Sequence, residues 1–232
     1  MRADSIECVI YTPSMAPIST PTYQLVRDLI RSDIVDGVWP LGSHMTMAEL
    51  VGRYGVSANP VREALQQLQG EGVIEIRMNR GAVVPQVDAR YIDHIYKLRA
   101  AVQVMLAREA AHRITPDATA RLRELCVLHE AAVADGDPAA CVRCNRELHH
   151  FMDKLADNPP AMEVLASRLC LVDAFRRTVG FGAGRLDKVV AQHRRLVRAI
   201  ARGDADLAAR AAHEHTESAR LDLLAALQGR QA

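Results

Sequence analysis

The stretch at residues 46–65 constrains the fold more than any other, because it reads as two short helices joined by a tight turn. Thr46 and Glu49 have the spacing of a capping box, which predicts the start of the first helix. Gly55 suits a backbone with positive φ, and Ser57 is a typical cap for the second helix. This pattern predicts a helix-turn-helix, whose second helix would lie in the major groove of DNA.

The segments on either side of this stretch extend the same pattern. Residues 73–76 and 82–84 are rich in β-branched residues, and the residues between them read as a turn. They predict a two-stranded wing after the recognition helix. Upstream, apolar residues at helical spacing over 22–36, followed by Gly37, predict a first helix that packs behind the other two. The domain would span residues 21–86.

The string VSANPVREALQQLQGEGVIEIRMNRGAVV resembles the winged-helix domain of GntR-family bacterial transcription regulators. The resemblance covers about residues 22–85 and includes the PVREAL core, the EG turn and the RGAVV wing. Ala58 stands where the family commonly has Arg. Arg62, on the same exposed side, should therefore carry more of the DNA contact. The resemblance implies binding to double-stranded DNA through Ser57, Asn59, Arg62, Arg80 and Gly81. The alternative is a winged helix used only for protein contacts.

The charge of the chain does not by itself indicate a nucleic-acid partner. The net charge is +1, and residues 1–87 carry seven arginines against nine acidic residues, a net of −2. Affinity for DNA depends on neutralising phosphates with basic side chains. Binding must therefore depend on where individual arginines lie rather than on total charge. The candidates are Arg53, Arg62, Arg77 and Arg80.

The length predicts two modest domains, and the lack of a visible export signal predicts a cytoplasmic protein. No run approaches the roughly 20 apolar residues of a membrane span. The N-terminus lacks a basic start followed by an apolar core, so no export signal is visible. Residues 1–20 mix Pro, Ser and Thr without periodicity, which predicts a flexible arm. The cysteine count is odd, which argues against a disulfide framework and favours ordinary thiols at Cys8, Cys126, Cys141, Cys144 and Cys170.

The second part of the chain, residues 87–232, shows helical periodicity throughout and no strand pattern. Caps, prolines and glycines divide it into six helices joined by short links, which predicts an antiparallel bundle. The fold class is therefore mainly α, a winged helix-turn-helix followed by a six-helix bundle. The predicted helices span about 88–113, 115–134, 137–157, 161–179, 185–202 and 204–228.

Three histidines of the bundle lie on apolar helix faces. They are His149, His193 and His215, whose neighbours at helical spacing are mainly small or aliphatic. His150 and His213, by contrast, share faces with charged residues and should be exposed. A single buried histidine is usually a hydrogen-bonded core residue, but three that point inward suggest a shared role.

Helix geometry brings these histidines to one level of the bundle. His193 lies ten residues before the turn at Gly203 and His215 lies twelve after it. At about 1.5 Å per residue, they are ~15 and ~18 Å from the turn and can sit opposite each other. Asn145 and His149 are four apart and share a face. Three imidazoles and an amide oxygen can thus converge, and imidazole suits zinc or nickel.

The bundle resembles the FCD effector domain of the FadR branch of GntR regulators. The segments that carry the resemblance are Leu98-Arg99, NRELHHFMDKLADN, QHRRLVRAIARGD and His215. Asn145 stands where Asp is usual in that branch, and Gln103 and Gln192 stand where Glu is usual. The resemblance implies a metal held by Asn145, His149, His193 and His215, with a small organic acid beside it. An amide oxygen can ligate a metal but contributes no charge.

Arg99 lies on an apolar stripe of its helix and therefore needs a partner. It can form an internal ion pair, or it can clamp a ligand carboxylate, which the resemblance favours. We interpret the chain as a ligand-responsive regulator that binds an inverted-repeat operator as a homodimer. The alternatives are a metal-dependent enzyme and a bundle whose histidines are purely structural. The enzyme is disfavoured because no spare carboxylate is evident beside the histidines.

Overall fold

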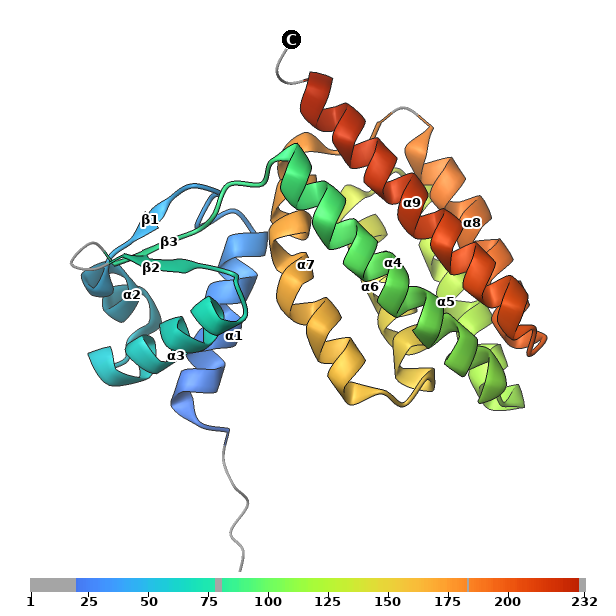
Figure 1. The fold of residues 1–232 in the computed structure, drawn as a ribbon, viewed down its shortest axis with the longest axis horizontal. Coiled ribbons are helices and arrows are strands. Elements are labelled where there is room, and N and C mark those ends of the chain that lie inside the picture. The colour runs from blue at the N-terminus through green and yellow to red at the C-terminus, as the bar shows by residue number, and fades with distance from the viewer. Residues whose placement is uncertain (1–19, 78–80, 183, 230–232) are drawn as a thin grey trace, which may run out of the picture.

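The computed structural model describes residues 20–77, 81–182 and 184–229, and its N-terminal part is a winged helix-turn-helix (Figure 1). This winged-helix region places three helices behind a small antiparallel sheet. Its mainly α fold with a wing confirms the predicted fold class. The elements are α1 (Thr22–Val35), β1 (His44–Met45), α2 (Met47–Tyr54), α3 (Ala58–Gly70), β2 (Glu75–Arg77) and β3 (Gly81–Val83).

The local signals around the helix-turn-helix are confirmed with one exception. The Thr46 hydroxyl accepts from the backbone N–H of Glu49 at 3.3 Å, and the Glu49 carboxylate accepts from the Thr46 N–H at 2.8 Å. Gly55 ends α2 with φ of 65°. Ser57 occupies the N-cap position of α3, but its side chain makes no capping hydrogen bond. The prediction of a side-chain cap at Ser57 was therefore wrong, and this exposed hydroxyl is left for other partners.

The sheet contains one strand more than the predicted two-stranded wing. The strand order is β1-β3-β2, with Met45 paired to Ala82 and Ala82 paired to Ile76. The two-residue strand β1 forms because the extended chain before α2 pairs with β3 and buries Met45 completely. A strand this short shows no alternation of apolar and polar residues, so its sequence gave no strand signal.

The second part of the chain forms the expected six-helix bundle (Figure 1). Its fourth element begins at Pro159, two residues before the predicted start, because Asn158 caps it and proline is tolerated in the first turn. None of the described helices has the length and apolarity needed to cross a membrane. The helices are α4 (Ala89–His112), α5 (Pro116–Ala134), α6 (Pro138–Leu155), α7 (Pro159–Val179), α8 (Arg185–Ala201) and α9 (Ala205–Gly229).

The winged-helix region and the bundle share one hydrophobic core. Helix α1 packs against α7, with Ile30 and Ile34 in the same buried cluster as Leu171 and Phe175 (Figure 1). An ion pair of 3.7 Å between Asp36 and Arg177 lies at the same contact. The sequence predicted only the short link that joins the wing to α4, so this side-by-side packing is a second connection between the two parts.

Some expectations concern residues outside the described ranges. These are the flexible arm, of which the structure describes only Thr20, as well as Cys8 and Arg80. The four remaining cysteines are free thiols, as the odd cysteine count suggested: Cys126, Cys141, Cys144 and Cys170.

Gly81 is required by the geometry of the wing. Its φ is 80°, and a Cβ atom at this position would lie 2.3 Å from the backbone oxygen of Met45 in β1. We expect Gly81→Ala to lower the free energy of unfolding by more than about 1 kcal/mol in urea titrations. Gly52→Ala, at an open position inside α2, is the control and should be neutral or stabilising. Equal effects of the two substitutions would contradict this account.

Candidate metal and effector site

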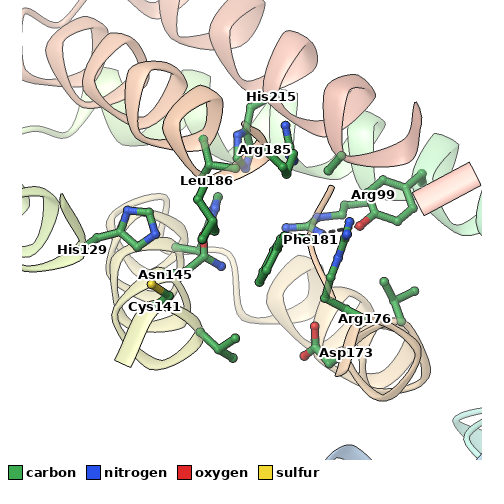
Figure 2. Close-up of a pocket in the computed structure, with 16 residues that line it drawn as sticks. Arg99, His129, Cys141, Asn145, Asp173, Arg176, Phe181, Arg185, Leu186 and His215 are labelled. Carbon is green, nitrogen blue, oxygen red and sulfur yellow. Dashed lines mark hydrogen bonds between the residues drawn. The ribbon is translucent and has the colours of Figure 1, made fainter. Parts of the chain in front are cut away.

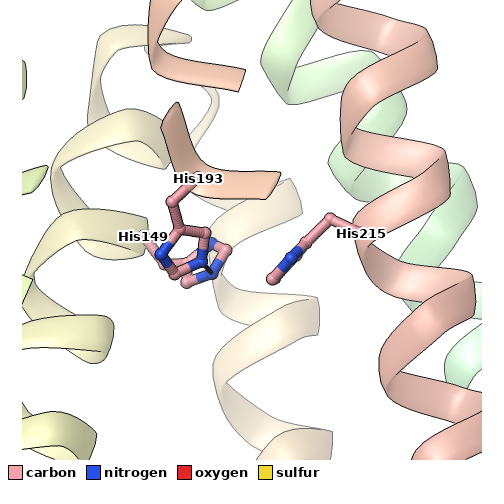
Figure 3. Close-up of side chains that lie close together, drawn as sticks. All are labelled: His149, His193 and His215. Carbon is pink, nitrogen blue, oxygen red and sulfur yellow. Dashed lines mark hydrogen bonds between the residues drawn. The ribbon is translucent and has the colours of Figure 1, made fainter. Parts of the chain in front are cut away.

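Three histidines from three helices meet in the bundle core. His149 of α6, His193 of α8 and His215 of α9 have their candidate ligand atoms within 4.8 Å of one another (Figure 3). The Nε2 atoms of His149 and His193 are 3.2 Å apart. His150 and His213 are exposed, as expected from their charged neighbours. The structure thus brings together the three histidines that the sequence singled out.

The spacing of one pair of these nitrogens matches two ligands of a single transition-metal ion. Two nitrogens that each lie 2.1 Å from one zinc ion, at angles between 90° and 110°, are about 3.0–3.4 Å apart. The observed 3.2 Å falls within this interval. Burial lowers the pKa of His149 to about 3 and holds the pKa values of His193 and His215 well below the ordinary value. The imidazoles are therefore neutral at pH 7 and offer the lone pairs that a metal needs.

The outer nitrogens of two of these histidines also have partners. The Nδ1 atom of His215 lies 3.2 Å from the side-chain oxygen of Gln192. Because an amide oxygen only accepts, this contact places the proton on Nδ1 and leaves Nε2 of His215 with its lone pair. Metal-ligating histidines commonly donate their second N–H in this way. Gln192 therefore orients His215 toward the cluster.

A fourth histidine joins the cluster and was missed in the sequence. His129 of α5 is buried, and its Nδ1 atom lies 3.4 Å from Nδ1 of His193. His129 is thus the partner of the outer nitrogen of His193, as Gln192 is the partner of the outer nitrogen of His215. A signal was available, because His129 continues an apolar stripe with Leu122 and Cys126 at helical spacing. The same rule that selected the other three histidines applies to it.

A cavity of about 100 Å³ opens beside the histidines, several times the space that one water molecule needs. His149, His215 and Asn145 line it on the side of the cluster, so Asn145 lies where the resemblance expected a metal ligand. Arg99 lines the same cavity (Figure 2). The cavity is therefore lined by Arg99 and by three of the four predicted metal residues, while His193 joins the site through its contact with His149.

Arg99 has neutral partners in this cavity. Its Nε donates to the side-chain oxygen of Gln103 at 3.1 Å, and its guanidinium lies over the ring of Tyr96, 5.4 Å from the centroid. Within the described part of the chain, no carboxylate forms an ion pair with Arg99. The internal ion pair that we considered for Arg99 is not found. Its charge is therefore available to a ligand.

One expectation about the histidines was wrong, because a carboxylate does lie near them. Asp153, one helical turn after His149, lines a smaller cavity of about 10 Å³ together with His149 and His215. Burial raises the pKa of Asp153 to about 6. Its side chain was overlooked because three of its four nearest helical neighbours, at positions 149, 150 and 157, are polar, so periodicity did not mark its face as buried.

Comparisons with known proteins agree with both parts of this architecture. Residues 22–84 match the family described as bacterial regulatory proteins of the gntR family, and residues 94–218 match the FCD domain. The chain is a GntR-family regulator with an FCD domain. The family and its relatives regulate transcription and are not enzymes, which excludes the enzyme alternative. FCD domains often bind metals.

Individual relatives cover most of this regulator. It is 25% identical to the transcriptional repressor RspR of Escherichia coli over 197 residues, 85% of this chain and 86% of RspR. It is 27% identical to a probable D-xylose utilization operon repressor of Paenarthrobacter nicotinovorans over 193 residues, 82% and 83% of the two chains. The fold is similar to that of E. coli McbR/YncC, with a TM-score of 0.78 and 20% identity over 92% of this chain and 100% of that one.

The regulator exposes three of the predicted DNA-binding residues at the start of α3. Ser57, Asn59 and Arg62 are exposed, and Arg62 donates to the Asn59 side-chain oxygen at 3.1 Å. Arg53 is different, because it forms a two-point ion pair with Asp33 of α1 at 2.5 and 2.8 Å. This pair lowers the pKa of Asp33 and holds α2 against α1. Arg53 is thus engaged within the fold, whereas Arg62 points to solvent.

Arg77 and Gly81 complete the described part of the predicted DNA surface. The Arg77 side chain lies 3.6 Å from that of Glu75 within β2 and is half exposed. Gly81 opens β3 against the backbone of β1, so it has a structural reason to be glycine whether or not it contacts DNA.

The buried neutral histidines make the stability of the metal-free protein depend on pH. Their folded pKa values lie below the unfolded value near 6.5, so the unfolded chain takes up protons first as the pH falls. The unfolding free energy is therefore highest above pH 6.5, and it decreases as the pH falls from 6.5 toward the folded pKa values. Between pH 7.5 and 5.5, chelator-treated protein should lose about 1 kcal/mol of unfolding free energy per buried histidine.

Denaturant titrations at each pH measure this loss. His215→Gln should remove one histidine's share of the pH dependence. The matched control is His213→Gln, which changes an exposed histidine two residues away and should leave the dependence as it is. A pH dependence that is the same in both variants would show that burial of the cluster does not set it.

Proposed function

We propose that this protein is a cytoplasmic, ligand-responsive transcription regulator that senses a small organic acid at a metal site in its FCD domain. Three buried, neutral imidazoles beside a cavity that also contains an unpaired arginine carry this proposal. A core that needed only to be filled has no use for either feature, since buried polar groups cost stability unless they are satisfied. The combination is what recognition of an anion requires.

The metal is best supported as zinc or nickel. His149, His193 and His215 would hold it through nitrogen, with Asn145 as a neutral fourth ligand. When bound, the ion supplies a positive charge to which a carboxylate oxygen can bind. The residues of the chain then decide which carboxylate fits. Because Asn145 adds no negative charge, the site keeps more of the ion's attraction for an anion.

Arg99 is the second attachment point for the effector carboxylate. Its contacts to Gln103 and Tyr96 fix the guanidinium without neutralising it. A planar guanidinium can donate two parallel hydrogen bonds to a carboxylate, which gives direction as well as affinity. An acid bound in the cavity would thus be held at the histidine cluster and at Arg99 together.

Two structural routes connect this cavity to the DNA-binding part. Arg99 lies on α4, which begins at Ala89, six residues after β3 ends at Val83. Helix α7 contributes Arg176 to the cavity, while its buried Leu171 and Phe175 join the core that contains α1. An effector that pulls on α4 or α7 would therefore change how the winged-helix region is held. In a homodimer, that change alters the spacing of two recognition helices on an inverted-repeat operator.

Arg62 should carry most of the specific DNA contact, because Ala58 supplies none and Arg53 is engaged by Asp33. An operator can be selected from a randomised duplex library with the parent protein. Arg62→Ala should weaken binding to that operator roughly tenfold or more in gel-shift titrations while the fold survives. Arg123→Ala, which removes an exposed charge from the bundle, is the control and should bind as the parent does. Unchanged binding by Arg62→Ala would contradict the assignment.

Arg99 should be needed for the response and not for DNA binding. We expect purified protein to contain zinc or nickel by elemental analysis, and small carboxylates to change its operator affinity about 5- to 150-fold, the usual range of allosteric coupling. Arg99→Ala should keep the metal and the basal operator affinity but lose this response. Arg108→Ala is the control, an exposed arginine on the same helix that pairs with Asp206. A metal-free parent, or a variant that still responds, would overturn the proposal.

A further inference from the structure

Arg185, the first residue of α8, is the most deeply buried arginine that lines the cavity. Its side chain is 6% exposed. One terminal nitrogen donates to the Ser218 hydroxyl at 2.7 Å and lies 3.5 Å from the Gln192 oxygen. Its Nε, however, is buried without a hydrogen-bond partner among the described residues, and the Asp222 carboxylate is 3.8 Å away. A buried guanidinium N–H without an acceptor is costly, so this donor calls for an acceptor from a ligand.

Arg176 adds a second positive charge to the same part of the cavity. It donates to Asp222 at 2.5 Å and to the backbone oxygen of Gly180 at 2.9 Å, and it stacks on Phe181 at 4.9 Å. Asp222 therefore serves two arginines and can neutralise only one of them. The other nearby carboxylate, Asp173, is 47% exposed and faces Arg146 at 3.8 Å.

The cavity therefore has an excess of positive charge before any metal is counted. Arg99, Arg176 and Arg185 all line it, whereas Asp173 is the carboxylate among its lining residues and Asp222 lies 3.8 Å from Arg185. Asp153 lines the smaller cavity on the other side of His149 and His215. Figure 2 shows Arg99 and Arg176 on one side of the cavity and Asn145 and Cys141 on the other. A single carboxylate held at the metal and Arg99 would leave the buried Nε of Arg185 without an acceptor.

We infer that the effector is a small dianion whose second acidic group is bound by Arg185 with the help of Arg176. This inference rests on the proposed function, since it assigns the first acidic group to the histidine cluster and Arg99. The second acidic group would accept a hydrogen bond from Nε of Arg185. It would also balance the one positive charge of Arg176 and Arg185 that Asp222 does not neutralise. The cavity volume of about 100 Å³ limits the connecting chain to a few carbons. Short dicarboxylates meet these requirements.

The test compares two acids that differ only at the far end. Malate and 2-hydroxybutyrate share four carbons and a 2-hydroxy acid group, but only malate carries a second carboxylate. Isothermal titration of zinc-loaded, full-length protein should give a Kd for malate on the order of tenfold lower or more, because a charge-assisted hydrogen bond is added. Equal Kd values for the two acids would overturn the inference.

Substitution at Arg185 locates the second subsite. Arg185→Gln should weaken malate binding on the order of tenfold while the Kd for 2-hydroxybutyrate stays within about twofold. The matched control is Arg195→Gln, a residue of the same helix that pairs with Glu214 of α9 outside the cavity. Retained affinity for 2-hydroxybutyrate shows that Arg185→Gln is folded. If Arg185→Gln does not fold, Arg185→Lys replaces it, because lysine keeps a positive charge at the site. A preference for malate that survives in Arg185→Gln would overturn the inference.

Failure of the dianion and failure of the proposed function give different binding results. If 2-hydroxybutyrate and other small monocarboxylates bind and change operator affinity but malate gains nothing, the proposed function stands and the dianion does not. If no small acid of either kind binds the zinc-loaded protein, the proposed function fails and the dianion fails with it.

Discussion

The burial of uncharged imidazoles at one level of the bundle is the constraint on which the rest of this structure depends. Neutral histidines can be buried only if their ring nitrogens find partners, because an unsatisfied polar group in a core is costly. Here the partners are other histidines and Gln192, so four helices must meet at one level. Alanines of α9 such as Ala208 and Ala212 are fully buried in this core and allow the close packing that the cluster needs.

The same packing decides what the cavity can influence. Helix α4 packs along α9 in the bundle and also buries Ile92 and Tyr96 in the core shared with α1. Helix α7 has a comparable double role, with Leu171 in that core and Arg176 at the cavity. Neither helix can move at the cavity without disturbing contacts to the winged-helix region, because close-packed interiors transmit displacement. Without this shared core, the short link between β3 and α4 alone would transmit less of such a displacement.

Sequence reasoning succeeded where the signal was local. The capping box at Thr46, the positive φ of Gly55 and the apolar faces around His193 all follow from spacing along one element. It failed where the outcome depends on which elements become neighbours. Strand β1 exists only because β3 lies beside it. The roles of Asp153 and Arg185 likewise depend on a cavity that no single helix defines, and so does the packing of α1 on α7.

The contacts of Gln103 and Gln192 explain why neutral amides suit these two positions, where the related branch commonly has glutamate. Gln103 accepts from Arg99 and from the Thr216 hydroxyl, so it fixes the guanidinium in place. A glutamate there would form an internal ion pair and reduce the charge offered to a ligand. Gln192 accepts from His215 and faces Arg185, and thereby connects the histidine cluster to the second arginine. Neutral amides at both positions keep the orientation of the cationic groups while leaving their charge to be balanced by what binds.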